Sequence, residues 1–334
     1  MHSRKVIGGS AILYISTMLD RTTEAAVTGK TEFADDIESL KYAVKRQNLE
    51  VDEVLLAADV HVVLNGLRLH YLDWGNQGKR PILFLHGGGL NAHTYDLVCL
   101  ALRGDYHCLA LDQRGHGDSE WSPVMDYDMR THAADIEALV GYLGLERFIL
   151  VGQSMGGVNA IQYAGQYPDR PAAMVAIDIG PETMITGGQR IRDFMNEPTE
   201  RESLDDFVSH ALAFNPRRDP RLLRRSLQHN LRRTPEGKFV WKWDPRPRRA
   251  GFNASRWEDR RSRLWAQVDQ IKCPTLVVRG AESDVLSEEN ATAFTNRLRD
   301  GHYAVVESAG HTIQGDNPSG LVREMRAFLS SRGL

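Results

Sequence analysis

The chain has few cysteines and no long apolar run. Its 334 residues include three cysteines, which are scattered through apolar segments without metal-binding spacing: Cys99, Cys108 and Cys273. An odd, dispersed set of this kind indicates reduced core residues and argues against a disulfide framework. No apolar stretch approaches the length that crosses a bilayer. The apolar stretch 6–19 is too diluted by glycine, serine and threonine to predict a signal peptide. We therefore expect a cytoplasmic protein.

The chain also lacks a strong excess of charge of either sign. It has 41 Lys and Arg against 44 Asp and Glu, a net charge of −3 and a pI near 6.5. Such a balance provides no general attraction for nucleic acid or for an acidic membrane surface. We therefore expect neither as a partner, and the sequence leaves self-association into a homo-oligomer open.

Short apolar runs recur from residue 60 onward and predict a sheet. Two alternating runs joined by Asn65-Gly66 predict a hairpin with a tight turn. Six continuous runs follow, as is typical of parallel strands covered on both faces: 82–85, 107–111, 148–151, 173–177, 274–278 and 303–306. Helical stretches such as 129–143 and 288–298 separate most of them. The sequence therefore predicts an α/β fold, a doubly wound and mostly parallel eight-stranded sheet whose sites gather at the carboxyl ends of the strands.

Two segments fall outside this pattern. Residues 33–58 carry helix formers with apolar residues at helical spacing, which predicts an arm packed on the main domain or on a partner subunit; a flap over the active site is the alternative. More than eighty residues with helical patterns and no strong strand separate Ile179 from the helical stretch 264–271, too many for a simple crossover. We therefore expect an N-terminal extension (1–58), a core (59–180 and 265–334) and an inserted helical lid (181–264).

The expected lid is rich in tryptophan and arginine. Four of the six tryptophans fall in it or at its end: Trp241, Trp243, Trp257 and Trp265. We expect most of them to form the lid's own core and one or two to contact substrate. The arginines favour a solvated face, with an anionic substrate as the alternative: Arg217, Arg218, Arg224, Arg225, Arg232, Arg233, Arg246, Arg248 and Arg249.

One pentapeptide carries the most specific chemical signal. Gly152-Gln153-Ser154-Met155-Gly156 fits G-x-S-x-G, directly follows the apolar run 148–151 and opens into a helical stretch. A serine on a sharp turn between a buried strand and a helix has its hydroxyl held clear of the backbone, and the flanking glycines remove clashing Cβ atoms. Ser154 is therefore the candidate nucleophile.

A serine hydroxyl needs a base, and the base needs a group that fixes its tautomer. His311 is the best base because it lies just past the last predicted strand, in Gly310-His311. For the carboxylate, Asp284 follows the strand that ends near residue 278 and is our first choice. Asp178, after the strand that precedes the lid, is the alternative acid, and Glu282 ranks third.

Acyl transfer also needs donors for the oxyanion that develops on the attacked carbonyl. His86-Gly87-Gly88-Gly89 directly follows the run 82–85, and no G-x-G-x-x-G pattern follows it that would favour a phosphate-binding loop. We assign the oxyanion hole to the backbone amides of Gly88 and of Met155, the residue after the nucleophile. We expect no cofactor and no metal.

These motifs, in this order, resemble the α/β-hydrolase superfamily, in the branch with a helical lid. The resemblance runs from about residue 60 to the C-terminus and also includes the loop 112–119, Asp-Gln-Arg-Gly-His-Gly-Asp-Ser. The resemblance implies that this loop shapes the rim of the site without doing chemistry. Haloalkane dehalogenases and epoxide hydrolases of the superfamily use aspartate as the nucleophile, so Ser154 argues against both activities.

The sequence thus predicts a serine hydrolase that cleaves a small or medium carboxylic ester or lactone through an acyl-enzyme. Hydrolysis of a carbon–carbon bond or an amide by the same triad is the alternative. A binding protein that kept the fold and lost turnover is a third interpretation, which the complete set of motifs disfavours.

Overall fold

The computed structural model describes residues 36–197, 199–247 and 254–334. Its main feature is an eight-stranded sheet with the order β1-β2-β4-β3-β5-β6-β10-β11. The antiparallel hairpin β1–β2 lies at one edge, and β3 to β11 in this sheet run parallel to one another. The strands are β1 (Ala58–Leu64), β2 (Leu67–Asp73), β3 (Pro81–Leu85), β4 (His107–Asp112), β5 (Phe148–Gln153), β6 (Pro171–Ile177), β10 (Thr275–Gly280) and β11 (Gly301–Val306). The predicted doubly wound, mostly parallel sheet is confirmed.

Alternate residues of the central strands β3, β4, β5 and β6 point to opposite faces of the sheet and enter two separate cores. In β3, Leu83 and Leu85 belong to one apolar cluster, whereas Ile82 and Phe84 belong to the other. This period of two is the geometry of a pleated strand. Because both faces are covered, every residue of the central strands β4, β5 and β6 is buried.

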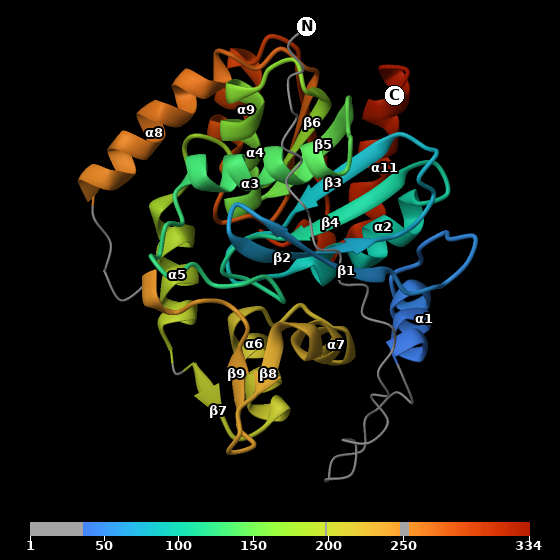
Figure 1. The fold of residues 1–334 in the computed structure, drawn as a ribbon, viewed down its shortest axis with the longest axis vertical. Helices are drawn as coiled ribbons and strands as arrows, with labels where there is room; N and C mark the ends of the chain where they lie inside the picture. The colour runs from blue at the N-terminus through green and yellow to red at the C-terminus, as the bar shows by residue number, and fades with distance from the viewer. Residues whose placement is uncertain (1–35, 198, 248–253) are drawn as a thin grey trace, which may run out of the picture.

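Helices form a layer on each face of the sheet (Figure 1). The first core cluster includes residues of α3 (Met129–Tyr142), α4 (Met155–Gln166), α8 (Ala254–Val268) and α9 (Glu288–Arg297). The second includes residues of α1 (Asp36–Arg46), α2 (Asp96–Leu102), α10 (Ile313–Asp316) and α11 (Pro318–Ser331). A short 3-10 helix, η2 (Ala92–Tyr95), leads into α2.

The segment between β6 and β10 holds α5 (Ile185–Asn196), α6 (Leu204–Phe214), α7 (Pro220–Asn230) and α8. It also contains a small antiparallel sheet that the sequence reading missed, formed by β7 (Glu200–Arg201), β8 (Leu231–Arg233) and β9 (Phe239–Trp241). These strands have only two or three residues, too few for a recognisable alternating pattern. Phe207, Leu223 and Leu227 form the centre of a third apolar cluster within this segment. Figure 1 shows α5, α6 and α7 as a group beyond the sheet.

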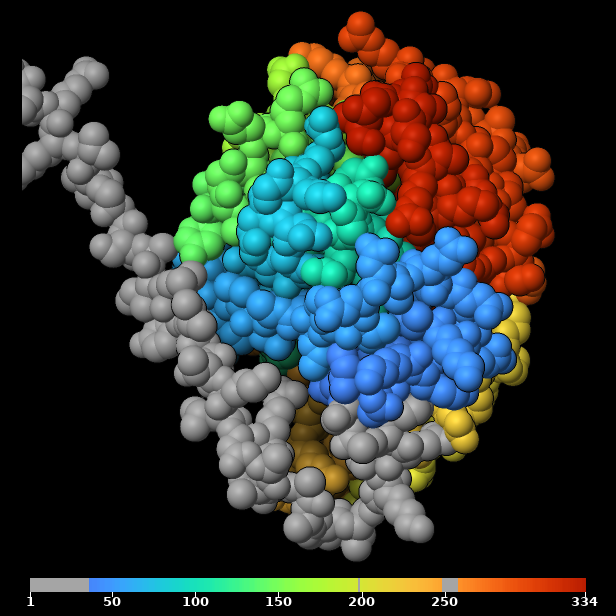
Figure 2. Space-filling view, turned by 90° about the vertical axis from the view of Figure 1, so that its right-hand side faces the viewer, coloured from blue at the N-terminus to red at the C-terminus, as the bar shows by residue number. Residues whose placement is uncertain are grey.

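The described part of the N-terminal extension packs on the outside of the core. Figure 2 shows residues 36–58 (blue) lying beside the hairpin and the C-terminal helix. Helix α1 buries Leu40 and Val44 in the second core cluster. Its Arg46 contacts Asp219 of the inserted segment, with 3.0 Å between Nε and Oδ2. None of the residues 36–58 lines the cavity described below. The stretch 6–19 lies outside the described residues, and among the described helices none is long and apolar enough to cross a bilayer.

Candidate active site

The candidate nucleophile lies on a strained turn. Strand β5 ends at Gln153, α4 begins at Met155, and Ser154 between them has φ 51° and ψ −117°. A positive φ is unfavourable for a residue with a side chain and persists only where the surrounding structure imposes it. Packing imposes it here, because a Cβ on Gly156 would collide with the backbone of Leu85 and one on Gly152 with the backbone of Gly156. This is the geometry of a nucleophile elbow.

The candidate base is held by Asp178. Nδ1 of His311 lies 2.8 Å from Oδ2 of Asp178, whose side chain is fully buried. The same carboxylate accepts hydrogen bonds from the Gly280 amide (3.0 Å) and from Oγ of Ser283 (2.5 Å). A carboxylate placed in this way favours the imidazole tautomer with hydrogen on Nδ1 and a free lone pair on Nε2.

Our first choice for the partner of His311, Asp284, is corrected by this geometry. Asp284 is partly exposed, and its Oδ2 lies 3.2 Å from Nε of Arg190 on α5. Asp178 directly follows β6, which pairs with β10, so its carboxylate reaches the loop after β10 and the loop that carries His311. Glu282, the third choice, pairs with Arg217 at the surface. The sequence showed several acids after strand ends, and only the order of the strands distinguishes them.

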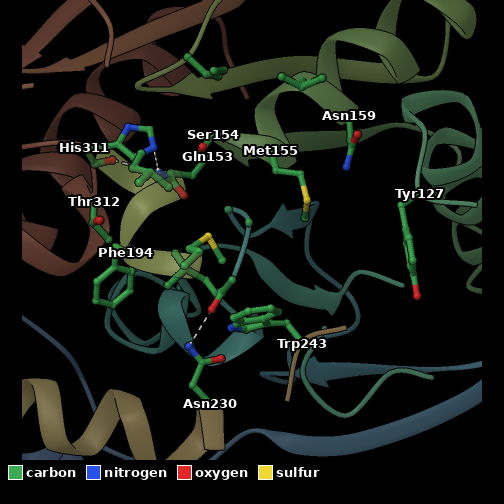
Figure 3. A pocket seen from close by; sticks show the side chains of 18 of the residues that line it. Tyr127, Gln153, Ser154, Met155, Asn159, Phe194, Asn230, Trp243, His311 and Thr312 are labelled. Carbon is green, nitrogen blue, oxygen red and sulfur yellow. Dashed lines mark hydrogen bonds between the residues drawn. The ribbon is translucent and has the colours of Figure 1, made fainter. Parts of the chain in front are cut away.

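The hydroxyl of Ser154 and the imidazole of His311 line the same cavity (Figure 3). No hydrogen bond joins them within the described part of the chain. The amide Nε2 of Gln153 instead lies 3.3 Å from Nε2 of His311 and donates to the His311 carbonyl at 3.0 Å. Catalytic hydrogen bonds are often long before substrate binds. A role of His311 as base therefore requires the Gln153 amide to give way to the Ser154 hydroxyl.

The candidate oxyanion loop is positioned from two sides. Gly88 and Met155 both line the cavity, and the Met155 amide belongs to the first turn of α4, where backbone N–H groups lack partners within the helix. Asn230, the last residue of α7, donates from Nδ2 to the carbonyl of Gly89 (2.9 Å), a bond drawn in Figure 3. Oδ1 of Asn230 accepts from Asn91 at 3.2 Å. The inserted segment thus holds the glycine loop in place. The sequence did not predict this contact, because Asn230 and Gly89 are about 140 positions apart in the chain.

The loop 112–119 lies behind the glycine loop rather than at the cavity rim. None of its residues lines the cavity, which corrects the role implied by the resemblance. The Gln113 amide donates to Nε2 of His86 (3.0 Å), and its side chain donates to the His86 carbonyl (2.7 Å). Burial lowers the pKa of His86, and the bond from the Gln113 amide requires an unprotonated Nε2 on its imidazole. These bonds hold the residue that precedes Gly87.

The cavity has a volume of about 810 Å³, within the range of sites for small organic ligands. Much of its wall is apolar and comes from the inserted segment: Ile191, Phe194, Met195, Phe214, Leu227, Trp241 and Trp243. Two of the four tryptophans of this region therefore face the cavity. Trp265 packs against the first core cluster, and the side chain of Trp257 lies outside the described residues.

Most arginines of the inserted segment that form ion pairs lie away from the cavity. The pairs away from the cavity are Arg190–Asp284, Arg201–Glu197, Arg217–Glu282, Arg224–Asp205, Arg225–Asp96 and Arg246–Asp244, and a longer pair joins the cavity residue Arg218 to Asp316. Arg218, Arg260 and Arg263 instead line the cavity. Arg248 and Arg249 lie outside the described residues.

Among residues 36–197, 199–247 and 254–334, two clusters of histidine and aspartate have spacing that could suit a metal ion: His93, Asp96 and His229, and His70, Asp112 and Asp118. In the first, the Arg225 guanidinium lies 2.6 Å from Oδ2 of Asp96 and opposes a second cation. In the second, burial acts to lower the pKa of His70, but hydrogen bonds with Asp112 and Asp59 outweigh burial and raise the pKa to about 10. A metal ion at this cluster would have to displace the proton of His70. We assign no metal to either cluster.

Comparison with known proteins places this geometry in a family. Residues 80–318 match the family model described as alpha/beta hydrolase fold. The chain is 32% identical over 270 residues to the esterase Rv0045c of Mycobacterium tuberculosis, covering 78% of this chain and 86% of the relative. It is 27% identical over 315 residues to epoxide hydrolase 1 of Caenorhabditis elegans, covering 87% and 76% of the two chains.

The crystal structure of the M. tuberculosis esterase superimposes with a TM-score of 0.72 at 28% identity, covering 89% of this chain and 98% of that one. The similarity therefore extends over most of both chains. The chain belongs to the α/β-hydrolase fold family and is a hydrolase.

Proposed function

We propose that the protein is a serine hydrolase that cleaves a small or medium carboxylic ester or lactone. One observation carries the proposal: a serine on a strained strand-to-helix turn shares a cavity with a histidine whose Nδ1 is bonded to a buried carboxylate. The similarity to an esterase supports the same chemistry. The catalytic residues of the proposal are Ser154, His311 and Asp178, with Asp178 in the role first given to Asp284.

In the proposed mechanism, Nε2 of His311 accepts the proton of the Ser154 hydroxyl as its oxygen attacks the ester carbonyl. The Asp178 carboxylate stabilises the imidazolium that forms. The backbone amides of Gly88 and Met155 donate to the oxyanion of the tetrahedral intermediate. His311 then returns the proton to the leaving alcohol, and a water molecule activated by His311 releases the acid.

Cleavage of an amide or a carbon–carbon bond would use the same residues and stays the alternative. Parallel assays with p-nitrophenyl esters, the matching anilides and a vinylogous diketone separate the three bonds. Opening of an epoxide is disfavoured, because Ser154 stands where epoxide hydrolases of the superfamily use aspartate. The two relatives described above are both named as enzymes, which supports catalytic activity over the interpretation as a binding protein without turnover.

The decisive test is replacement of the nucleophile. Ser154→Ala should lower kcat for p-nitrophenyl esters about 10⁴- to 10⁶-fold while the melting temperature stays within a few degrees. Ser226→Ala is a matched control, since Ser226 also lines the cavity but has no assigned role. A fluorophosphonate probe should label the wild type and not the Ser154→Ala variant. Turnover at the wild-type rate in Ser154→Ala would end the proposal.

Several further expectations accompany it. We propose that 181–264 acts as a lid, supported by its contribution to the cavity wall, and that 1–58 is an arm rather than a flap. A cytoplasmic location is supported by the three buried cysteines, all of which are free thiols. The absence of a cofactor and the absence of nucleic-acid and membrane partners stay predictions, and self-association into a homo-oligomer stays an open alternative.

A further inference from the structure

Arg218 is an arginine of the cavity wall without an adequate partner. It lies between α6 and α7, and only 14% of its side chain is exposed. Its nearest carboxylate is that of Asp316, where 3.7 Å separate Nη1 and Oδ1, too far for a hydrogen bond. Its Nε is buried and has no hydrogen-bond partner. Within the described ranges, its guanidinium donates no hydrogen bond at all.

The nearby carboxylates are already engaged elsewhere. Asp316 accepts from the Gly310 amide at 3.0 Å and from Nδ2 of Asn215 at 3.4 Å. Asp219 caps α7 through the Arg221 and Leu222 amides and pairs with Arg46 of α1. Burial therefore lowers the pKa of Arg218, with Asp316 and Asp219 opposing the change only in part. Leaving a buried charged donor unpaired is costly, so Arg218 has much to gain from an anionic ligand.

The position of Arg218 places it near the proposed chemistry. Its guanidinium packs so closely against α10 that a Cβ on Gly315 would collide with it. Helix α10 begins two residues after His311, and Thr312 between them lines the cavity (Figure 3). A ligand group bound at Arg218 would thus share the cavity with a carbonyl held at Ser154.

Among the other charged side chains that line the cavity, arginines outnumber acids. Arg130, Arg260 and Arg263 also line it, against two acids, Asp128 and Asp259. Asp128 is occupied by capping α3, where its Oδ1 accepts from the Arg130 amide at 2.7 Å. The lining side chains therefore carry a net positive charge, while the remaining wall is mostly apolar.

We infer that Arg218 binds a carboxylate on the substrate, so that the preferred substrate is a half-ester of a dicarboxylic acid. The apolar wall would hold the carbon chain, Ser154 would attack the ester at one end, and Arg218 would bind the carboxylate at the other. The planar guanidinium suits a carboxylate because two N–H groups can donate to its two oxygens. This inference rests on the proposed ester hydrolysis and adds the substrate class.

The test compares acyl chains that differ only in their far end. The p-nitrophenyl monoesters of adipic and suberic acid are assayed beside p-nitrophenyl hexanoate and octanoate. We expect the wild type to have a higher kcat/KM for at least one monoester than for the neutral ester of equal length. Arg218→Gln should reduce that ratio about ten- to hundredfold, mainly through KM, and leave the neutral esters within about threefold. Arg218→Lys should restore part of the ratio.

Arg217→Gln is the matched control, because Arg217 is the exposed neighbour that pairs with Glu282. It should leave the ratio unchanged. Free adipate or suberate should also raise the melting temperature of Ser154→Ala, and not that of the Ser154→Ala, Arg218→Gln double variant. No preference for the monoesters in the wild type, or an equal loss on both ester types in Arg218→Gln, would overturn the inference. Failure to hydrolyse any of the four esters would instead overturn the proposed function.

Discussion

Asp178 connects three segments through one buried carboxylate. It receives hydrogen bonds from His311, Gly280 and Ser283, and Ser283 in turn accepts from the Val285 and Leu286 amides at 3.1 and 3.2 Å. Its own backbone has φ 50°, a strained value at the end of β6. These hydrogen bonds together hold the Asp178 carboxylate, and through it the His311 imidazole, in one orientation.

The two candidate acids differ in a way that one pair of variants can measure. Asp178→Asn should lower kcat about 10³- to 10⁴-fold, because the amide favours the wrong imidazole tautomer. Asp284→Asn should change kcat less than about threefold, since it removes only a surface ion pair with Arg190. Steady-state kinetics on a p-nitrophenyl ester, with melting temperatures to confirm folding, make the comparison. A larger loss in Asp284→Asn would return the role to our first choice.

At the scale of elements, α7 and the glycine loop act together. The helix has Asp219 as its N-cap and Pro220 in its first turn, and it ends at Asn230, whose amide holds Gly89. The first cap and the proline are standard helix-start signals, whereas the contact at the end links the inserted segment to the loop after β3. The position of the proposed oxyanion donors thus depends on a helix outside the core sheet.

Removal of this link should affect catalysis more than substrate binding. Asn230→Ala deletes the bond to the Gly89 carbonyl, so we expect kcat to fall about tenfold with little change in KM, a smaller effect than loss of an oxyanion donor itself. The buried Asn91 amide loses its acceptor, which should cost about 1–3 kcal/mol of stability. Gln228→Ala, an exposed change on the same helix, is the control. An unchanged kcat in Asn230→Ala would show that the core alone positions the loop.

At the scale of the whole molecule, a buried ion pair joins the antiparallel hairpin to the parallel sheet. Nδ1 of His70 on β2 lies 2.8 Å from Oδ2 of Asp112 at the end of β4. Asp112 also accepts from the Ala92 and Asp118 amides, at 2.7 and 2.8 Å. Burial acts to raise the pKa of Asp112, but the hydrogen bond with His70, the electrostatic interactions with His70 and His86 and the bond from the Asp118 amide together outweigh burial and hold the pKa well below its usual range.

The pair makes stability depend on pH in a defined direction. The raised pKa of His70 contributes stability that is complete below its ordinary value of 6.5 and is lost progressively as pH rises to about 10. The lowered pKa of Asp112 contributes stability above about pH 4 that is lost as pH falls. The full contribution therefore lies between about pH 4 and 6.5.

Urea unfolding across this range checks the prediction. His70→Leu leaves a buried, unpaired carboxylate and should lower the free energy of unfolding by about 3–5 kcal/mol near pH 6. The difference from the wild type should shrink toward pH 10. Arg68→Ala, an exposed change on the same strand, should cost less than about 1 kcal/mol. A difference that stays constant from pH 6 to pH 10 would contradict the assignment of a charged His70.

Local patterns in the sequence were sufficient to predict the sheet and the sharp turn at Ser154. Continuous apolar runs, the Asn65-Gly66 turn and the glycines around Ser154 each act through near neighbours in the chain, and the structure has a strand, a hairpin and a sharp turn at these places. The short strands β7, β8 and β9 were missed, because two or three residues carry no period.

Contacts between distant segments could not be found in this way. The choice of Asp178 over Asp284 depends on β6 lying beside β10, and the hold of Asn230 on Gly89 depends on how α7 packs. The weak pairing of Arg218, whose nearest carboxylate lies 3.7 Å away and accepts hydrogen bonds from other groups, is likewise visible only in the folded structure. The sequence alone thus determined the family, the positions of the strands along the chain and the sharp turn at Ser154, because these features follow from local backbone and burial preferences. The tertiary structure decided which acid holds His311 and which side chain supports the glycine loop, because these contacts join residues more than a hundred positions apart.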